Sequence, residues 1–341
     1  MKLLMVRTTS FGDIIHAFPA LTDAASRIDD LVCDWLVEDS YACMPPWHPA
    51  VRHVIPVSMR GWRRAPWLQH APAIRRFVRQ LRRERYDLVL DAQGLLKSAL
   101  LARLARGPAM GLDRHSAGEA PAARLYHDTV AVEPGQHAID RNRALFAGAL
   151  GYKVPEPMAY GLRLPDDPEH GASQGHEPYL VFIPGTTWPS KQWPESYWRD
   201  LTERATGAGW RVRINAGSGA ERSAAERIAK GIANVDVPPL SIEQLAHVLR
   251  GARAVVSVDS GPGHLAAAVG TPGVSIYGAT DPALMGTRGP GQVHLCVDFE
   301  CSPCLRRRCQ FADSGQVYPD CYATVPPPHV WGTLRDLLQT C

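Results

Sequence analysis

The sequence lacks three features, and each lack argues against a class of protein. No stretch approaches the roughly 18–20 apolar residues that a membrane span needs, and the apolar run Leu3–Val6 is too short for a signal peptide. The first strand leads into Thr8-Thr-Ser-Phe-Gly-Asp13, without the G-x-G-x-x-G of a dinucleotide site, which disfavours an NAD-dependent dehydrogenase. A net charge of only +3 gives no support to nucleic-acid binding. A cytoplasmic globular protein is expected.

The length and the order of patterns predict two α/β domains. A chain of 341 residues is too long for one average core. Strands, polar loops and helices alternate on both sides of a Pro-, Gly- and Asp-rich stretch between Leu162 and Pro178. We therefore expect one domain over 1–165, a second over 175–325, and a C-terminal helix over 326–341.

The clearest βαβ unit lies at residues 254–277. Ala254–Val258 predicts a buried parallel strand, 259–263 a turn, and His264–Val269 a short helix. A turn that opens a helix is a ready anion site, because the first helical N–H groups are unpaired. Asp259, Ser260, Gly261 and His264 are candidates for holding hydroxyl or phosphate groups. The competing interpretation is an ordinary Gly-rich connection with a capping Ser.

Other turns of the second half carry similar residues. Thr186, Thr187 and Lys191 follow one strand, and Gly217, Ser218 and Glu221 follow the next. In a doubly wound domain such turns lie on one rim. Hydroxyls for phosphates, a Lys for charge and a Glu for sugar hydroxyls together favour a nucleotide diphosphate.

The first half combines an acidic turn with many arginines. Asp13 lies in the first turn of a helix predicted over Ile14–Ala25, where it is either a cap or a functional carboxylate. A helix over 72–85 has one apolar and one strongly cationic face, which suits either solvent or an anionic surface such as membrane phosphates. Because Arg60, Arg63 and Arg64 are close by in sequence, an acidic or phosphorylated substrate is favoured.

Four of the eight cysteines form a C-x2-C-x4-C-x11-C segment: Cys301, Cys304, Cys309 and Cys321. The C-x2-C half suits a structural zinc or iron knuckle, and reduced thiols or a disulfide are the alternatives. Arg306, Arg307 and Arg308 inside the segment are expected to lower the thiol pKa values.

Four ordered motifs resemble the lipopolysaccharide heptosyltransferases over nearly the whole chain. They are Thr8-Thr-Ser-Phe-Gly-Asp-Ile-Ile-His-Ala-Phe-Pro, Asp91-Ala-Gln-Gly-Leu-Leu-Lys, Thr186-Thr187 with Lys191-Gln-Trp-Pro, and Val258-Asp-Ser-Gly-Pro-Gly-His-Leu. The resemblance implies a GT-B fold: two Rossmann-like domains facing across a cleft, with the acceptor on the first and the donor on the second. It also implies ADP-L-glycero-β-D-manno-heptose as donor, Kdo2-lipid A as acceptor, and work at the cytoplasmic face of the inner membrane.

The resemblance also implies roles for single residues. Asp13 matches the general base, and Lys191 together with the Ser260/Gly261 turn would neutralise charge on the departing ADP. The implied donor contacts are Thr186, Thr187, Glu221, Asp259 and His264, and the implied acceptor contacts are Arg60, Arg63 and Arg64. The family's acceptor-binding Arg near 117–119 is absent, because this chain has Gly118, with Arg114 and Arg124 as possible substitutes. The chemistry needs no metal, so any metal at the cysteines would be structural.

Two alternatives stay open besides the dehydrogenase. One is a GT-B enzyme with a different nucleotide-sugar or a later core heptose acceptor, since the residues by themselves do not separate adenine from uracil. The other is a nucleic-acid binder that uses the Arg-rich helix and a zinc knuckle, against which the near-neutral charge and the two complete α/β halves argue.

Overall fold

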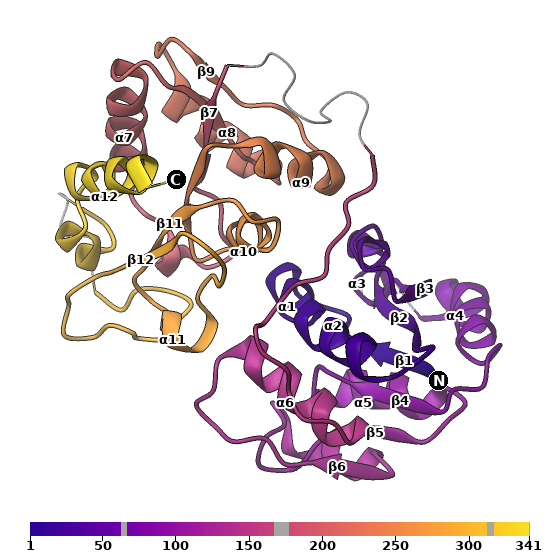
Figure 1. The fold of residues 1–341 in the computed structure, drawn as a ribbon. Coiled ribbons are helices and arrows are strands. Elements are labelled where there is room, and N and C mark those ends of the chain that lie inside the picture. Colours follow the sequence, from indigo (N-terminus) through magenta and orange to yellow (C-terminus); the bar gives the residue numbers. More distant parts are fainter. Residues whose placement is uncertain (63–66, 167–176, 312–316, 341) are drawn as a thin grey trace. The chain divides into compact units, whose positions relative to one another are not determined.

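The computed structural model of the chain describes residues 1–62, 67–166, 177–311 and 317–340 (Figure 1). Its contacts divide it into two compact units, Met1–Arg163 and Leu164–Cys341. Among the described residues, no helix is both long enough and apolar enough to cross a membrane.

The first unit is built on a six-stranded parallel sheet with the order β3-β2-β1-β4-β5-β6. The strands are β1 (Lys2–Val6), β2 (Val32–Glu38), β3 (Val51–Val57), β4 (Leu88–Asp91), β5 (Ala109–Leu112) and β6 (Asp128–Val130). The helices are α1 (Phe11–Ile15), α2 (Phe18–Arg27), α3 (Met59–Trp62), α4 (Trp67–Leu81), α5 (Leu96–Leu104) and α6 (Ala138–Leu150). The central strands are apolar because helices cover them on both faces.

Two helical layers enclose this sheet. Helices α2 and α6 pack against each other on one side. The other side is a core in which Phe77 and Leu81 of α4 and Leu101 of α5 join side chains of β1 to β5. Each loop that leaves the carboxyl end of a strand therefore opens on the same rim of the unit, where doubly wound folds bind ligands.

The second unit repeats this plan with the order β12-β11-β10-β7-β8-β9, again all parallel. Its strands are β7 (Tyr179–Ile183), β8 (Arg211–Ile214), β9 (Val235–Asp236), β10 (Ala254–Val258), β11 (Gly273–Tyr277) and β12 (Gln292–Cys296). Its helices are α7 (Glu195–Gly207), α8 (Gly219–Ala229), α9 (Ile242–Gly251), α10 (Gly261–Ala268), α11 (Pro282–Met285) and α12 (Pro327–Thr340).

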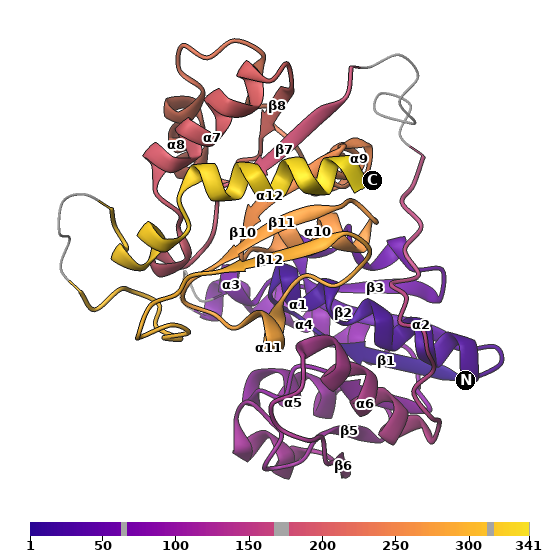
Figure 2. The same cartoon turned by 60° about the vertical axis from the view of Figure 1, so that its left-hand side comes forward.

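The C-terminal helix α12 belongs to the core of the second unit. It lies beside α7 and along the sheet, as Figure 2 shows, and contacts β10 and β11. Val330 and Leu334 are fully buried in the cluster that also holds Trp198 of α7.

Two sequence predictions need correction, and one stretch is assigned only by the structure. The helix expected over Ile14–Ala25 is two helices, α1 and α2. The stretch between Gly107 and His137, where the pattern is weak, contains β5 and β6 joined through a 3-10 helix. Helix α10 starts at Gly261 and not at His264, because Ser260 caps it and Pro262 is tolerated in a first helical turn.

His48 makes the first unit sensitive to acid. Its Nδ1 accepts the Ala50 N–H at 3.1 Å and its Nε2 lies 3.0 Å from the Thr22 hydroxyl, so the buried ring is neutral. Burial, and then the positive charge of Arg163, lower the pKa of His48 from 6.5 to about 4. The unfolded chain therefore takes up the proton first as the pH falls, and stability is lost between pH 6.5 and 4.

We expect the titration of His48 to lower the free energy of unfolding by roughly 3 kcal/mol between pH 7 and pH 4. Urea unfolding of wild type and His48→Asn at both pH values measures it. The Asn oxygen can still accept the Ala50 N–H without titrating, so the variant should lose about that much less on acidification. Equal losses in the two proteins would show that His48 is not responsible.

Candidate functional site

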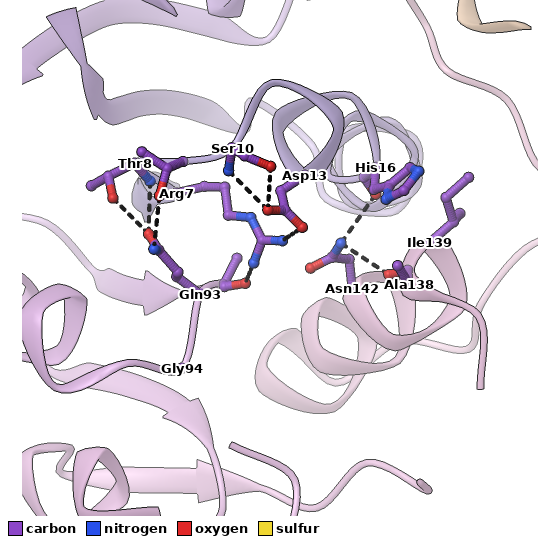
Figure 3. Close-up of polar contacts among 12 residues, drawn as sticks. Arg7, Thr8, Ser10, Asp13, His16, Gln93, Gly94, Ala138, Ile139 and Asn142 are labelled. Carbon is purple, nitrogen blue, oxygen red and sulfur yellow. Dashed lines mark hydrogen bonds and ion pairs between the residues drawn. The ribbon is translucent and has the colours of Figure 1, made fainter. Parts of the chain in front are cut away.

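The loop after β1 holds Asp13 by contacts to both carboxylate oxygens (Figure 3). Arg7 Nη2 donates to Oδ1 at 2.8 Å, and the backbone N–H and hydroxyl of Ser10 each donate to Oδ2 at 2.8 Å. Arg7 is itself fixed by a hydrogen bond to the Ala92 carbonyl. Asp13 is thus the capping partner of Ser10 at the start of α1. Its side chain is still 42% exposed, so a substrate hydroxyl can reach it.

The loop after β4 is joined to the same place. Gln93 Oε1 accepts the Thr8 N–H at 3.0 Å and the Thr8 hydroxyl at 2.7 Å. The buried Asp91 carboxylate fixes the base of the loop through the Gln93 N–H at 2.8 Å and the Tyr126 hydroxyl at 2.6 Å. Burial raises the pKa of Asp91 more than these hydrogen bonds lower it. The Asp91 motif therefore shapes the rim beside Asp13.

Arg60 lies on the same side of the first unit as the start of α1. Its guanidinium carbon is 5.5 Å from the centre of the Tyr41 ring, and that ring packs edge-on against Phe11 at 6.0 Å. The Arg60 N–H donates to Glu38 Oε1 at 2.8 Å, which anchors its backbone. Arg60 is thus linked to α1 through the rings of Tyr41 and Phe11, and its positive charge suits an anionic ligand near Asp13. Arg63 and Arg64 lie outside the described residues.

The segment around Gly118 packs against the Gln93–Gly94 loop. The Glu119 N–H donates to the Gly94 carbonyl at 3.0 Å, and a Cβ on Gly118 would lie 3.2 Å from a Leu95 methyl carbon. Arg114 and Arg124 are exposed there. A different cation, Arg141 of α6, donates to the Ser116 carbonyl at 2.6 Å. The sequence gives no local signal for Arg141, because it comes from a helix 23 residues beyond Gly118.

In the second unit, buried Asp259 organises the rim after β10. Its Oδ2 accepts Lys191 Nζ at 2.7 Å and the Thr280 hydroxyl at 2.6 Å, and its Oδ1 lies 3.4 Å from His264 Nε2. Burial by itself raises the pKa of Asp259, but the hydrogen bonds and charges of His264 and Lys191 outweigh it, so the pKa lies below its usual value. Asp259 is therefore an anion that holds Lys191 in place.

Lys191 has further support from its own loop. Its Nζ lies 4.6 Å from the centre of the Trp188 ring, and its side chain is 14% exposed. The Thr186 hydroxyl donates to the Asp259 carbonyl at 3.1 Å, which joins this loop to the end of β10. Thr187 is exposed beside it. A cation, hydroxyls and the N-terminus of α10 at Ser260 and Gly261 are thus gathered at one rim of the second unit, as an anion site requires.

Glu221 lies on the turn after β8 and packs against Gly185 in the turn after β7. Its Oε2 accepts the Gly217 N–H at 2.8 Å, and a Cβ on Gly185 would approach its carboxyl carbon to 2.7 Å. Only glycine at 185 therefore leaves Glu221 where it is. A depression of about 390 Å³ adjoins this turn. Its lining residues are Ala216, Gly217, Ser218, Gly219, Arg222, Pro239, Leu240 and Ser241.

The cysteine segment supports the Lys191 loop through its backbone. The Arg306 carbonyl accepts the Ser190 hydroxyl at 2.5 Å, and the Leu305 N–H donates to the Ala279 carbonyl at 2.8 Å. Tyr322, just beyond the last cysteine of the segment, donates to the Ser190 carbonyl at 3.2 Å. These contacts give the segment a role in positioning Lys191 without any contribution from the thiols.

The thiols of the segment correct one sequence prediction, the expected lowering of their pKa values. Within the described part of the chain, Cys301, Cys304, Cys309 and Cys321 form no disulfide, and no group of three or more His, Cys, Asp or Glu side chains is arranged to hold a metal ion. The four-cysteine segment Cys301, Cys304, Cys309 and Cys321 thus has no assembled ligand set there. The expected lowering of thiol pKa values is wrong for two of them: burial raises the pKa of Cys301, and raises that of Cys321 to about 12. Arg306–Arg308 are exposed and leave this burial uncompensated.

The structure thus gathers most of the predicted donor residues in the second unit and places Asp13 and Arg60 in the first. Sequence patterns do not single out four residues that support these loops: Arg7, Gln93, Arg141 and Thr280. Gln93 meets Thr8 across 85 residues and Thr280 meets Asp259 across 21 because parallel strands pair, whereas Arg141 reaches Ser116 from helix α6.

Comparison with known proteins assigns the class of this protein. A family model described as glycosyltransferase family 9 (heptosyltransferase) matches residues 74–314. The chain belongs to glycosyltransferase family 9, and the expected GT-B fold and glycosyltransferase activity are confirmed.

Named relatives are similar over nearly the whole chain. Lipopolysaccharide heptosyltransferase 1 of Pseudomonas aeruginosa is 47% identical over 99% of this chain and 98% of its own length. The solved structure of E. coli heptosyltransferase WaaC with ADP is 40% identical, with a TM-score of 0.81, over 87% of this chain and 94% of its own. The WaaC structure with ADP-2-deoxy-2-fluoro heptose is 36% identical, with a TM-score of 0.82, over 98% and 99%.

Proposed function

We propose that this protein is an inverting heptosyltransferase that moves L-glycero-D-manno-heptose from ADP-heptose to the Kdo of Kdo2-lipid A. The observation that carries the proposal is the 47% identity, over 99% of the chain, to a lipopolysaccharide heptosyltransferase 1. The ADP and ADP-heptose analogue named for the WaaC structures support the donor. We also propose domain roles: 1–165 binds the acceptor, 175–325 binds the donor, and 326–341 is the C-terminal helix.

The donor would bind at the rim of the second unit. Its diphosphate would contact Lys191, the hydroxyls of Thr186 and Thr187, and the start of α10 at Ser260 and Gly261. Glu221 would accept hydrogen bonds from the ribose hydroxyls, with the adenine in the adjoining depression. Asp259 and His264 complete this set, and Asp259 acts mainly by fixing Lys191.

The acceptor would bind at the rim of the first unit. Asp13 would take the proton of the attacking Kdo hydroxyl as that oxygen forms its bond to the anomeric carbon and ADP leaves from the opposite face. Arg60, with Arg63 and Arg64, would hold the anionic Kdo and lipid A phosphates, and Arg141 would supply the cation that Gly118 does not. At the effective dielectric of a protein surface, two charges about 4 Å apart gain roughly 4 kcal/mol.

The charge that develops on the leaving ADP determines the rest of the mechanism. We propose that Lys191 and the N-terminus of α10 neutralise it, so that catalysis requires no metal or other cofactor. Positive groups fixed before the reaction stabilise such charge without reorganising. We further propose that the protein works in the cytoplasm, at the inner-leaflet surface of the inner membrane where a lipid acceptor is accessible, and that it has no nucleic-acid partner.

Transfer from ADP-heptose to Kdo2-lipid A in detergent, with EDTA present, tests the proposal. We expect a product with one added heptose whose anomeric configuration, read by NMR, is opposite to that of the donor. Retained configuration would overturn the direct displacement. Turnover of another nucleotide-sugar, or of an acceptor that already carries heptose, with none of Kdo2-lipid A, would leave the GT-B transferase and overturn the substrate assignment.

A further inference from the structure

The outer face of α5 carries a row of leucines although it faces solvent. The helix buries Ala99, Leu101 and Ala102 towards the sheet. Leu96, Leu100 and Leu104, each four residues apart, are 41%, 53% and 42% exposed. Side chains at this spacing form one row along a helix, unlike the single exposed apolar residues of an ordinary surface. A helix that is apolar on both sides is normally covered by another body.

The neighbouring helix α4 adds a row of positive charge. Arg75, Arg76 and Arg79 are exposed on it, and Arg82 and Arg83 continue the row just beyond its end. Neither Trp67–Leu81 nor Leu96–Leu104 contains an acidic residue.

The two helices are joined side by side. Arg82 Nη1 donates to the Leu104 carbonyl at 2.9 Å, and Phe77 of α4 shares a core cluster with Leu101 of α5. Their outer surfaces are therefore continuous. We call this surface the Leu–Arg face, made of Leu96, Leu100, Leu104, Arg75, Arg76, Arg79, Arg82 and Arg83.

The nearest acidic groups do not cancel this charge. Glu84 is paired with Lys2 at 3.0 Å, and the Glu119 carboxylate accepts the Leu96 N–H at 2.7 Å. The charge is also uneven along the chain: residues 1–163 contain 22 Lys or Arg and 16 Asp or Glu, whereas 164–341 contain 15 and 18. The excess positive charge of the protein thus belongs to the unit that carries the Leu–Arg face.

The apolar row starts beside the acceptor rim. Helix α5 begins directly after the Gln93–Gly94 loop, and Gln93 binds Thr8 in the loop that leads to Asp13. A body that covers the row would therefore lie next to the place where an acceptor hydroxyl must arrive.

We propose that the Leu–Arg face docks the protein on an anionic phospholipid bilayer, with the three leucines among the acyl chains and the arginines at the lipid phosphates. Apolar side chains beside arginines, on two helices that contain no acidic residue, match an interfacial membrane surface. A second copy of the chain would bring the same positive row against itself, which favours the bilayer as the partner. The proposal takes its purpose, delivery of a lipid-linked acceptor, from the proposed function, but its test does not require transfer.

Vesicle co-sedimentation of the full chain tests the docking. We expect binding to vesicles of phosphatidylglycerol and phosphatidylcholine, and little to phosphatidylcholine alone. The variant Arg75→Gln/Arg76→Gln/Arg79→Gln should bind the anionic vesicles about 100-fold more weakly. The variant Leu96→Gln/Leu100→Gln/Leu104→Gln should lose about 10-fold or more. Arg82 is left unchanged because it binds the Leu104 carbonyl.

Matched controls separate the effect of the Leu–Arg face on vesicle binding from that of surface charge and exposed apolar side chains elsewhere. Arg27→Gln changes an exposed Arg of α2, the helix that packs with α6 on the other side of the sheet, and Val154→Gln changes an exposed apolar residue that follows α6. Both should bind vesicles like wild type. Because every position is exposed, all variants should keep the wild-type melting temperature and transfer to detergent-dispersed acceptor.

Each outcome decides the point. Wild-type binding by the two triple variants, or equal binding of wild type to neutral vesicles, would overturn the docking. A leucine variant that dissociates a dimer without losing vesicle binding would show that the face joins two copies. If the triple variants lose vesicle binding but the wild-type protein transfers no heptose, the docking is supported and the proposed function is overturned instead.

Discussion

Asp13→Asn is expected to lower kcat for heptose transfer about 10²–10⁴-fold, the usual contribution of a general base. The amide keeps the shape of the carboxylate, and its oxygen can still accept the Ser10 N–H, but it cannot take the proton of the attacking hydroxyl. Single-turnover rates at saturating donor and acceptor measure the loss. Affinity for ADP, measured by calorimetry, should not change, because the proposed donor contacts all lie in the second unit.

Ser10→Ala is the matched control for this prediction. It removes one of the hydrogen bonds to Asp13 Oδ2 and leaves the backbone N–H and Arg7 in place. Because Arg7 and the Ser10 N–H still hold the carboxylate, kcat should fall by about 10-fold at most, far less than in Asp13→Asn. An Asp13→Asn enzyme at the wild-type rate would mean that another group is the base and that Asp13 serves α1 only as a cap.

Lys191→Met is expected to lower kcat about 10²–10³-fold, the typical effect of removing one group that stabilises transition-state charge. The Met side chain keeps the packing against Trp188 while it removes the cation. Weaker ADP binding should accompany the loss, but to a smaller extent, because charge on the leaving ADP is greatest in the transition state. Rates and ADP affinities of the two proteins give this comparison.

Stability provides the control for Lys191. Its removal leaves the buried Asp259 carboxylate with His264 and Thr280 but without its cation, so Lys191→Met should also melt at a lower temperature. Lys191→Met/Asp259→Asn removes the uncompensated anion and should recover much of the melting temperature but none of the rate. If the double variant also recovers kcat, Lys191 acts only by neutralising Asp259.

The accuracy of the sequence predictions differs between the rims of the two units. At the second, the residues predicted from the turns after β7, β8 and β10 do come together, because every turn after a parallel strand opens on the same edge. The interpretation of Asp259 as a ligand contact was incomplete, since the structure commits its oxygens to Lys191, Thr280 and His264. Composition gave no hint that Thr280, 21 residues further on, would be the third partner.

The sequence by itself determined the two parallel sheets, the position of Asp13 in a helical turn, and the gathering of Lys191, Glu221 and Asp259 at one rim. These follow from local patterns, since apolar runs make buried strands and their polar ends must share an edge.

Only the tertiary structure decided which side chains hold these groups and which face of the molecule is left apolar. Gln93 contacts Thr8 because β4 pairs with β1, and the thiols of Cys301 and Cys321 are made less acidic by burial that their arginine neighbours do not offset. The leucines of α5 fit a buried helix by pattern, and only the packing shows that three of the four face outward. Burial and long-range partners depend on how distant segments meet, and no local pattern contains that information.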